Sequence, residues 1–175
     1  MAYTGADVAP NDQATAEQFN WLKNKRPEVI WKAATETVNN SAVLQNDDDL
    51  LLTMAANEVW LVELMLLLES ASATPDFKFG WTYPVACTMY WGYSGGEPAG
   101  ARPTWSGIGA VLVLRIQTDE MIALAVAGVI GLRITAIVTN GANAGTLQLQ
   151  WAQNGATAEN SSILINSCLI AHLLS

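Results

Sequence analysis

Apolar and polar residues alternate with a period of two in two stretches of the chain. In Asp76–Thr82, two phenylalanines and a tryptophan fall on one face, with lysine, glycine and threonine on the other. Thr146–Gln153 alternates in the same way. Because successive side chains of a strand point to opposite faces, this period predicts strands that bury one face.

Short apolar runs separated by Gly, Asn, Asp and Ser clusters occupy most of the chain from about Val38. Ser94–Gly107, with several glycines and two prolines, is the one long predicted loop. Many short strands with little helix predict an all-β fold, an antiparallel β-sandwich of jelly-roll type. The other predicted strand segments are Ala42–Gln45, Leu50–Ala55, Val59–Leu68, Thr88–Tyr93, Gly109–Gln117, Met121–Ala127, Leu132–Thr139 and Ile163–Leu174.

The segment Leu50–Leu68 permits two interpretations. Its Leu, Met, Ala and Glu residues all favour a helix. We favour two strands hinged at Ala56 and Asn57, because the β segment Asp76–Tyr93 needs strands with which to pair.

The N-terminal segment has the pattern of a short helix. Thr15–Gln18 fits a capping box, and Pro27 predicts that the helix ends at about Lys25. A helix of about ten residues is not stable alone in water, so we expect it to dock on its own domain or on a partner. We therefore expect residues 1–37 to form an arm with one short docking helix, followed by a β-sandwich domain over residues 38–175.

The charge balance excludes some functions. The chain has 8 Lys and Arg against 16 Asp and Glu, a net charge of −8, and only 14% of its residues are charged. An acidic surface argues against nucleic-acid binding, which needs cations to neutralise phosphates. The low charge fraction indicates a surface that is covered in an oligomer or larger assembly. Half of the basic residues lie in residues 1–36, so the acidic charge belongs mostly to the β domain.

The sequence does not predict a membrane span or a leader. The most apolar windows, Leu50–Leu68 and Met121–Val138, are interrupted by Glu58 and Arg133 among other polar residues. Met1–Pro10 does not have the pattern of a signal peptide, and we expect synthesis and assembly in the host cytoplasm.

Few residues suggest catalysis. His172 is the single histidine, and Cys87 and Cys168 are expected to be buried thiols outside any nucleophile motif. Asp119 and Glu120 are adjacent, so in a strand their side chains point to opposite faces and cannot flank one glycosidic bond. We expect no enzyme activity, no cofactor and no dedicated metal site.

Two features of the sequence are compatible with ligand binding. Asp47–Asp49 is expected to be an acidic solvated turn, with a Ca²⁺ site on a threefold axis as the alternative. Trp81, Trp91 and Trp105 lie around the long loop, where they predict either packing and subunit contact or the stacking of a sugar ligand.

Several stretches resemble known proteins. Two stretches resemble small β-sandwich modules of tailed-bacteriophage virion proteins: Asn39–Trp60 and Gly145–Asn154. The second is followed by a Thr/Ser/Asn-rich turn and the closing segment Ser162–Leu174. Gln13–Asn20 is similar to the short attachment helices that open many phage appendage proteins. The resemblance implies a homotrimeric, jelly-roll-like domain on a virus particle, either cementing capsid subunits or on a tail fibre or tip.

The sequence lacks the heptads and collagen-like repeats of long fibre proteins. We therefore favour a capsid decoration protein that binds the major capsid protein on the outer capsid surface. The alternative is a tail-fibre or tail-tip knob, with tail proteins or a host surface glycan as its partner. The expected anchoring residues of the arm are Phe19, Trp21, Leu22, Lys23, Lys25 and Arg26.

Overall fold

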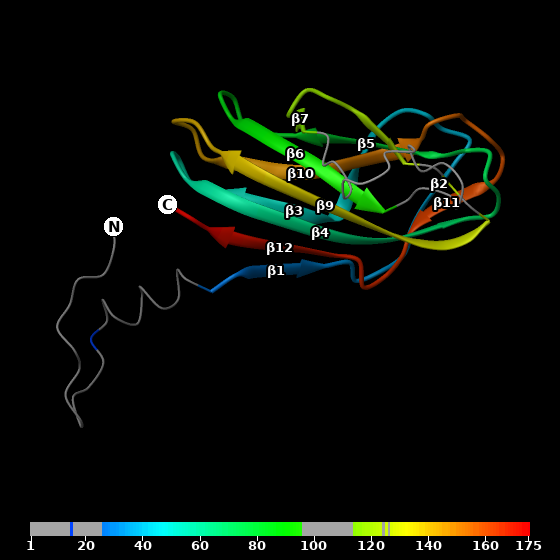
Figure 1. Ribbon diagram of the computed structural model, residues 1–175, viewed down its shortest axis with the longest axis horizontal. Helices are drawn as coiled ribbons and strands as arrows, with labels where there is room; N and C mark the ends of the chain where they lie inside the picture. Colours follow the sequence, from blue (N-terminus) through cyan, green and yellow to red (C-terminus); the bar gives the residue numbers. More distant parts are fainter. Residues whose placement is uncertain (1–14, 16–25, 96–113, 124, 126) are drawn as a thin grey trace, which may run out of the picture.

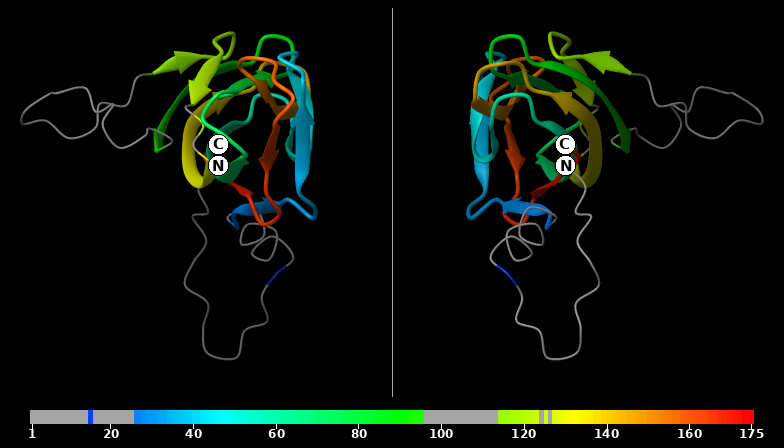
Figure 2. Two further views of the ribbon diagram at one scale, coloured as in Figure 1. Left: turned by 90° about the vertical axis from the view of Figure 1, so that its right-hand side faces the viewer. Right: turned by 90° about the vertical axis from the view of Figure 1, so that its left-hand side faces the viewer.

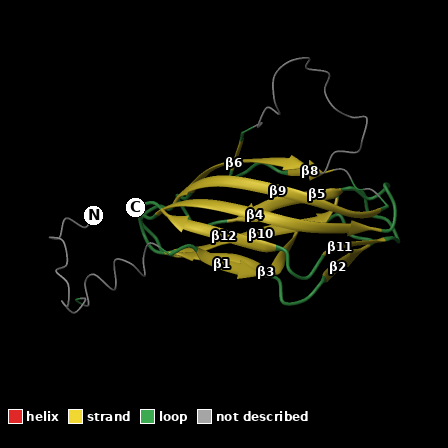
Figure 3. Cartoon of the chain, turned by 60° about the horizontal axis from the view of Figure 1, so that its bottom comes forward, coloured by secondary structure: helices red, strands yellow, loops and turns green. Residues whose placement is uncertain are grey.

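The computed structural model describes residues 15, 26–95, 114–123, 125 and 127–175. All regular structure in these residues is β-strand, as Figure 3 shows. The strands are β1 (Glu28–Trp31), β2 (Glu36–Asn39), β3 (Gln45–Met54), β4 (Val59–Ser70), β5 (Phe77–Thr82), β6 (Thr88–Gly95), β7 (Arg115–Ile116), β8 (Met121–Ala123), β9 (Gly128–Thr139), β10 (Gly145–Gln153), β11 (Asn160–Ile163) and β12 (Cys168–Leu173).

The strands form two antiparallel sheets. The larger sheet has eight strands in the order β1–β12–β4–β9–β6–β7, and β11 continues along β4 beside β2 (Figure 1). The smaller sheet has four strands in the order β3–β10–β5–β8. Most successive strands alternate between the sheets, so nearly all pairings join segments far apart in sequence. The predicted all-β, antiparallel fold is confirmed.

The hydrophobic core lies between the two sheets, which Figure 2 shows end-on. The even-numbered residues of β4, from Trp60 to Leu68, are at most 4% exposed and face inward. From the smaller sheet, Phe77, Phe79 and Trp151 are fully buried against them. Burying each large apolar side chain contributes about 1.5–3 kcal/mol, so this alternation is what holds the sheets together.

The segment that permitted a helix forms two strands, β3 and β4, as predicted. The turn between them contains Asn57, whose φ of 63° lies in the left-handed region that asparagine tolerates. The Asn57 N–H donates to the carbonyl of Gly141 at 2.8 Å. The hinge predicted at Ala56 and Asn57 is confirmed.

Residues 28–39 belong to the larger sheet. β1 pairs with β12 and β2 pairs with β11 in one continuous register, from Glu28 opposite Ala171 to Asn39 opposite Asn160. The pairing is interrupted at the same level in both segments, over residues 32–35 between β1 and β2 and over residues 164–167 between β11 and β12. The structure thus places β1 and the first two residues of β2, which were expected to belong to the arm, inside the larger sheet. The predicted helix after Thr15 lies outside the described residues.

Two other predicted strand segments differ from the structure. Residues 42–44 form a loop before β3, where the sequence predicted a strand from Ala42. The run Ile163–Leu174 is divided, because Ser167 and its neighbours turn between β11 and β12. In the described part of the chain, no helix is long and apolar enough to cross a membrane.

Candidate functional site

The outer face of the larger sheet is mainly apolar. In the register of the sheet, its central part consists of three rows of neighbouring residues, which we call the apolar face. The rows are Trp31, Cys168, Met65, Arg133 and Ser94; Val29, Ile170, Glu63, Thr135 and Gly92; and His172, Leu61, Ile137, Tyr90 and Ile116.

Large side chains of the apolar face are open to solvent. The exposed fraction is 61% for Trp31, 59% for Tyr90 and 47% for Met65. Glu63 and Arg133 form an ion pair with each other, so each partly neutralises the other's charge. A contiguous exposed patch of this kind is typical of a surface that binds another protein.

The outer face of the smaller sheet is mainly polar by contrast, with Leu51 and Ile122 as its apolar positions. Its half-buried and exposed positions include Thr53, Thr146, Gln148, Gln150 and Lys78. Antiparallel sheets commonly present one polar face to water. The smaller sheet follows this rule and the larger sheet does not, so the asymmetry identifies the apolar face as the candidate functional surface.

The structure places two of the three suggested tryptophans in the core. Trp91 is fully buried and Trp81 is 6% exposed, and their rings meet edge to face with centroids 5.8 Å apart. The Trp91 indole N–H donates to the carbonyl of Ile116 at 2.9 Å. These rings pack against each other, and neither presents a face on which a sugar could stack. Trp105 lies outside the described residues.

Among the tryptophans that the structure describes, Trp31 is the exposed one, and it is not among the site residues predicted from the sequence. Its signal was present in the sequence, since Val29 and Trp31 lie two positions apart and share one face of a strand. Of the expected anchoring residues, Arg26 is exposed just before β1, and the other five lie outside the described residues. The apolar face thus begins close to where the expected arm joins the sheet.

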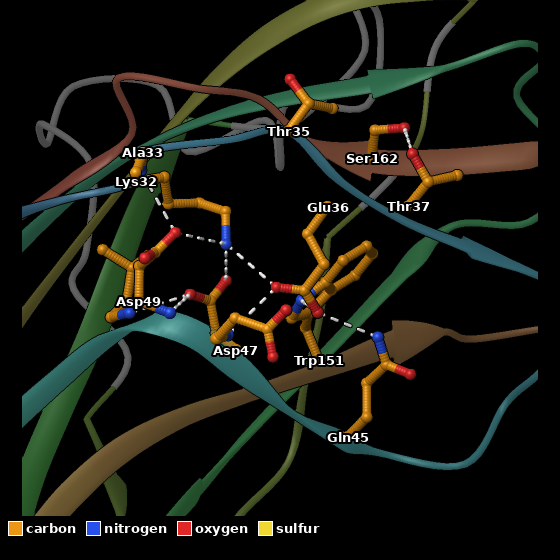
Figure 4. A network of polar contacts seen from close by, with 12 residues as sticks. Lys32, Ala33, Thr35, Glu36, Thr37, Gln45, Asp47, Asp49, Trp151 and Ser162 are labelled. Atoms are coloured by element: carbon orange, nitrogen blue, oxygen red, sulfur yellow. Dashed lines mark hydrogen bonds and ion pairs between the residues drawn. The ribbon is translucent and has the colours of Figure 1, made fainter.

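A second feature, a cluster of charges, lies inside the sandwich (Figure 4). The Lys32 ammonium lies 2.8 Å from Asp47 Oδ2, 2.9 Å from Glu36 Oε2 and 3.8 Å from Asp49 Oδ2. The side chains of Lys32 and Asp47 are fully buried. The expectation that residues 47–49 form a solvated turn is therefore wrong for Asp47, whose carboxylate contacts this protein's own lysine.

Two irregularities in the sheets create this cluster. Lys32 lies where the chain leaves the ladder between β1 and β2, so its side chain enters the space between the sheets. In β3, Asn46 pairs with Gln150 but Leu51 pairs with Gln148, so four residues oppose one across this bulge. A bulge redirects side chains, and here it turns Asp47 inward.

The carboxylates control the protonation of Lys32. Burial alone would lower its pKa, because a poorly solvated ammonium is disfavoured. Hydrogen bonds to Asp47 and Glu36, together with their Coulombic attraction, outweigh burial and raise the pKa of Lys32 above its usual 10.5. The cluster therefore holds an ammonium among carboxylates.

The histidine, the Asp119 carboxylate and the two cysteines that the sequence offered as reactive groups are placed as follows in the fold. His172 is half-buried on the apolar face, and Asp119 Oδ2 accepts the Ile116 N–H at 2.9 Å. Cys87 is buried, Cys168 is half-buried and both are free thiols. Within the described residues, no group of three His, Cys, Asp or Glu side chains has the arrangement of a metal site.

Comparison with known proteins finds one weak structural likeness and no match in sequence. No family model and no curated protein matches the chain. Among solved structures, the chain is similar to the tripod (BppUct-A-L) from the baseplate of bacteriophage Tuc2009. The identity is 11%, the match covers 98% of this chain and 75% of that chain, and the TM-score is 0.31. At this score the likeness carries no argument about fold or function.

Proposed function

We propose that this protein is a non-enzymatic structural component of a tailed-phage virion and assembles with copies of itself through the apolar face. The observation that carries the proposal is the contrast between the two outer faces, apolar on the larger sheet and polar on the smaller. The low charge fraction and the resemblance of Asn39–Trp60 and Gly145–Asn154 to phage virion modules support it.

We further propose that the sandwich is a jelly roll. We count β1 with β2 as one interrupted strand, count β11 with β12 as another, and leave out β6 and β7. The chain then has eight strands, and the larger sheet contains the first (β1/β2), the last (β11/β12), the third (β4) and the sixth (β9). The other sheet contains the second, seventh, fourth and fifth, and β6 and β7 are an insertion that widens the first sheet. This order supports two interlocked Greek keys, which is the jelly-roll arrangement.

For the place on the particle, we propose a homotrimer that decorates the outer capsid surface and binds the major capsid protein. Many copies acting together need only modest affinity at each contact. The burial of Trp81 and Trp91 removes most of the support for a glycan-binding tail knob. Labelling purified particles with an antibody against this protein tests the place. Label on the capsid supports decoration, and label confined to the tail refutes it.

Self-assembly is tested by mass in solution. Tyr90 and Ile137 are cross-strand neighbours on the apolar face, and their double substitution Tyr90→Thr/Ile137→Thr keeps β-favouring side chains. Each exposed apolar residue that an interface buries contributes about 1–3 kcal/mol, so we expect the variant to dissociate at concentrations where the wild type is oligomeric.

The matched control is Thr53→Ser/Thr146→Ser, a cross-strand pair on the smaller sheet, which should keep the wild-type mass. Circular dichroism should show that both variants retain the wild-type β-sheet signal. A monomeric wild-type protein, or a Tyr90→Thr/Ile137→Thr variant with unchanged mass, would contradict assembly through this face.

A further inference from the structure

The buried charge cluster brings an amine and a carboxyl carbon within reach of each other. Lys32 Nζ lies 2.8 Å from Asp47 Oδ2, and the carboxyl carbon Cγ is one bond beyond that oxygen. Both side chains are fully buried between the sheets (Figure 4). Groups held in this way react with effective concentrations of up to about 10⁵–10⁸ M when they are well aligned.

The other oxygen of Asp47 is held by the backbone. The N–H groups of Asp49 and Leu50 donate to Asp47 Oδ1 at 3.1 Å and 2.8 Å. The bulge in β3 frees these two donors from the ladder with β10. Two backbone N–H groups at this distance form the arrangement that stabilises negative charge on the oxygen of a tetrahedral intermediate.

A second carboxylate is placed to move protons. Glu36 Oε2 accepts from Lys32 Nζ at 2.9 Å and from the N–H of Asp48 at 3.1 Å. The amide of Gln45 at 2.9 Å and the indole N–H of Trp151 at 3.2 Å hold Glu36 Oε1. These contacts fix the Glu36 carboxylate beside the amine.

We propose that Lys32 and Asp47 join in an intramolecular amide bond, formed in the folded protein with Glu36 as the proton carrier. Formation of this bond does not depend on the proposed virion role. It uses a nucleophile, an electrophile, an oxyanion site and a base that this chain itself supplies, and it needs no oxidant, cofactor or co-reactant.

The reaction condenses the Lys32 ammonium with the Asp47 carboxylate and releases one water. Glu36 takes one proton from the ammonium, and the amine lone pair then attacks Cγ of Asp47 while the C=O electron pair moves to Oδ1. Oδ2 receives that proton from Glu36 and a second proton from the nitrogen, and it leaves as water. The three protons of the ammonium become one amide N–H and two water hydrogens, and Glu36 returns to a carboxylate. One positive and one negative charge disappear.

The interior favours this product. An ion pair deep in a protein carries a large desolvation cost, and an amide in its place is uncharged. The carboxylates that keep Lys32 protonated are also the acceptors to which its proton transfers, since both lie within 3 Å of Nζ. The bond ties the connection between β1 and β2 in the larger sheet to β3 in the smaller sheet.

Intact mass of the purified wild-type protein tests the proposal directly. The sequence corresponds to 18.7 kDa. After denaturation, we expect a mass below that of the same polypeptide without the bond by one water, about 18 Da. A wild-type protein at the full mass of its polypeptide overturns the proposal, and this result needs no variant to fold.

Trypsin digestion of the denatured protein locates the bond. An unmodified Lys32 is a cleavage site and yields residues 26–32 and 33–78 as separate peptides. An acylated Lys32 is not cleaved, so we expect one peptide of residues 26–78 that is lighter by one water. Cleavage after Lys32 in the wild type would contradict the bond.

Two variants separate the chemistry from general packing. Glu36→Gln keeps the size of the side chain and one of its two acceptor oxygens, but its carboxamide cannot carry the proton, so we expect the full mass. Lys78→Arg is the matched control, because Lys78 lies 3.9 Å from Glu120 in a more exposed pair, and it should retain the loss of water. Loss of water in a folded Glu36→Gln protein would overturn the assigned role of Glu36.

Discussion

The buried carboxylate of Asp47 depends on Lys32 as its ion-pair partner. Removing Lys32 leaves this carboxylate in the interior without a cation, and breaking a buried pair in this way typically destabilises a protein by about 3–5 kcal/mol. Replacing both with apolar residues removes that cost, so the pair is a place where two substitutions should be tolerated better than one.

We therefore expect Lys32→Met to have a lower free energy of unfolding than Lys32→Met/Asp47→Leu, by about 2 kcal/mol or more. Neither variant can form the proposed amide, so the comparison isolates the unpaired carboxylate of Asp47. Urea unfolding followed by circular dichroism measures the difference. Equal stability of the two variants would indicate that Asp47 finds another partner or is solvated.

The two thiols should differ in reactivity. Burial raises the pKa of Cys87, so its thiolate is scarcer at a given pH and the reagent cannot reach it. We expect an alkylating reagent at pH 8 to modify Cys87 only after unfolding, which exposes the thiol and removes the cause of its raised pKa. Mass spectrometry of the Cys168→Ser variant checks this without interference. Rapid modification of folded protein would contradict the buried position.

At the scale of elements, the β3–β4 hinge depends on the conformation of Asn57. A β-branched residue at a φ of 63° is strained, by about 1–2 kcal/mol. We expect Asn57→Val to lower the midpoint of thermal unfolding and Asn57→Gly to leave it near the wild-type value, because glycine adopts this φ freely. Equal midpoints for the two variants would show that the turn rearranges.

The sequence predicted the elements whose pattern is local. β5 and β10 follow from alternation, and the division of Leu50–Leu68 follows from the need for pairing partners. The sequence does not predict the four-residue strands β1 and β2, because they are short and separated by the break around Lys32. The bulge that turns Asp47 inward leaves no periodic signal, since it depends on the pairing of β3 with a distant strand.

The candidate surface was predictable only in part. Low charge indicated a covered surface, but which face is covered depends on the order of the strands in the larger sheet. Trp81 and Trp91 were suggestive because of their nearness to a glycine-rich loop, and their alternation within β5 and β6 points them into the core instead. The sequence does not single out Trp31, because its segment lies within the predicted arm.

At the scale of the whole molecule, Cys168 reports on coverage of the apolar face. It lies opposite Trp31 and Met65 in the sheet. We expect alkylation of Cys168 to be at least about tenfold slower in the assembled wild type than in the dissociated Tyr90→Thr/Ile137→Thr variant, because association removes solvent from this face. Equal rates in the two proteins would place the self-contact elsewhere.

The pairing of Glu28 with Ala171 has a mechanical consequence. Because β1 and β12 are antiparallel, tension applied between residues 28 and 171 pulls on the first pair of the ladder and opens it pair by pair, as a zipper opens. Such peeling would reach Lys32 after Trp31 separates from Cys168. There the load would pass from hydrogen bonds of one sheet to the tie with Asp47 in the other, so the cluster lies where it would arrest the peeling of the edge strand.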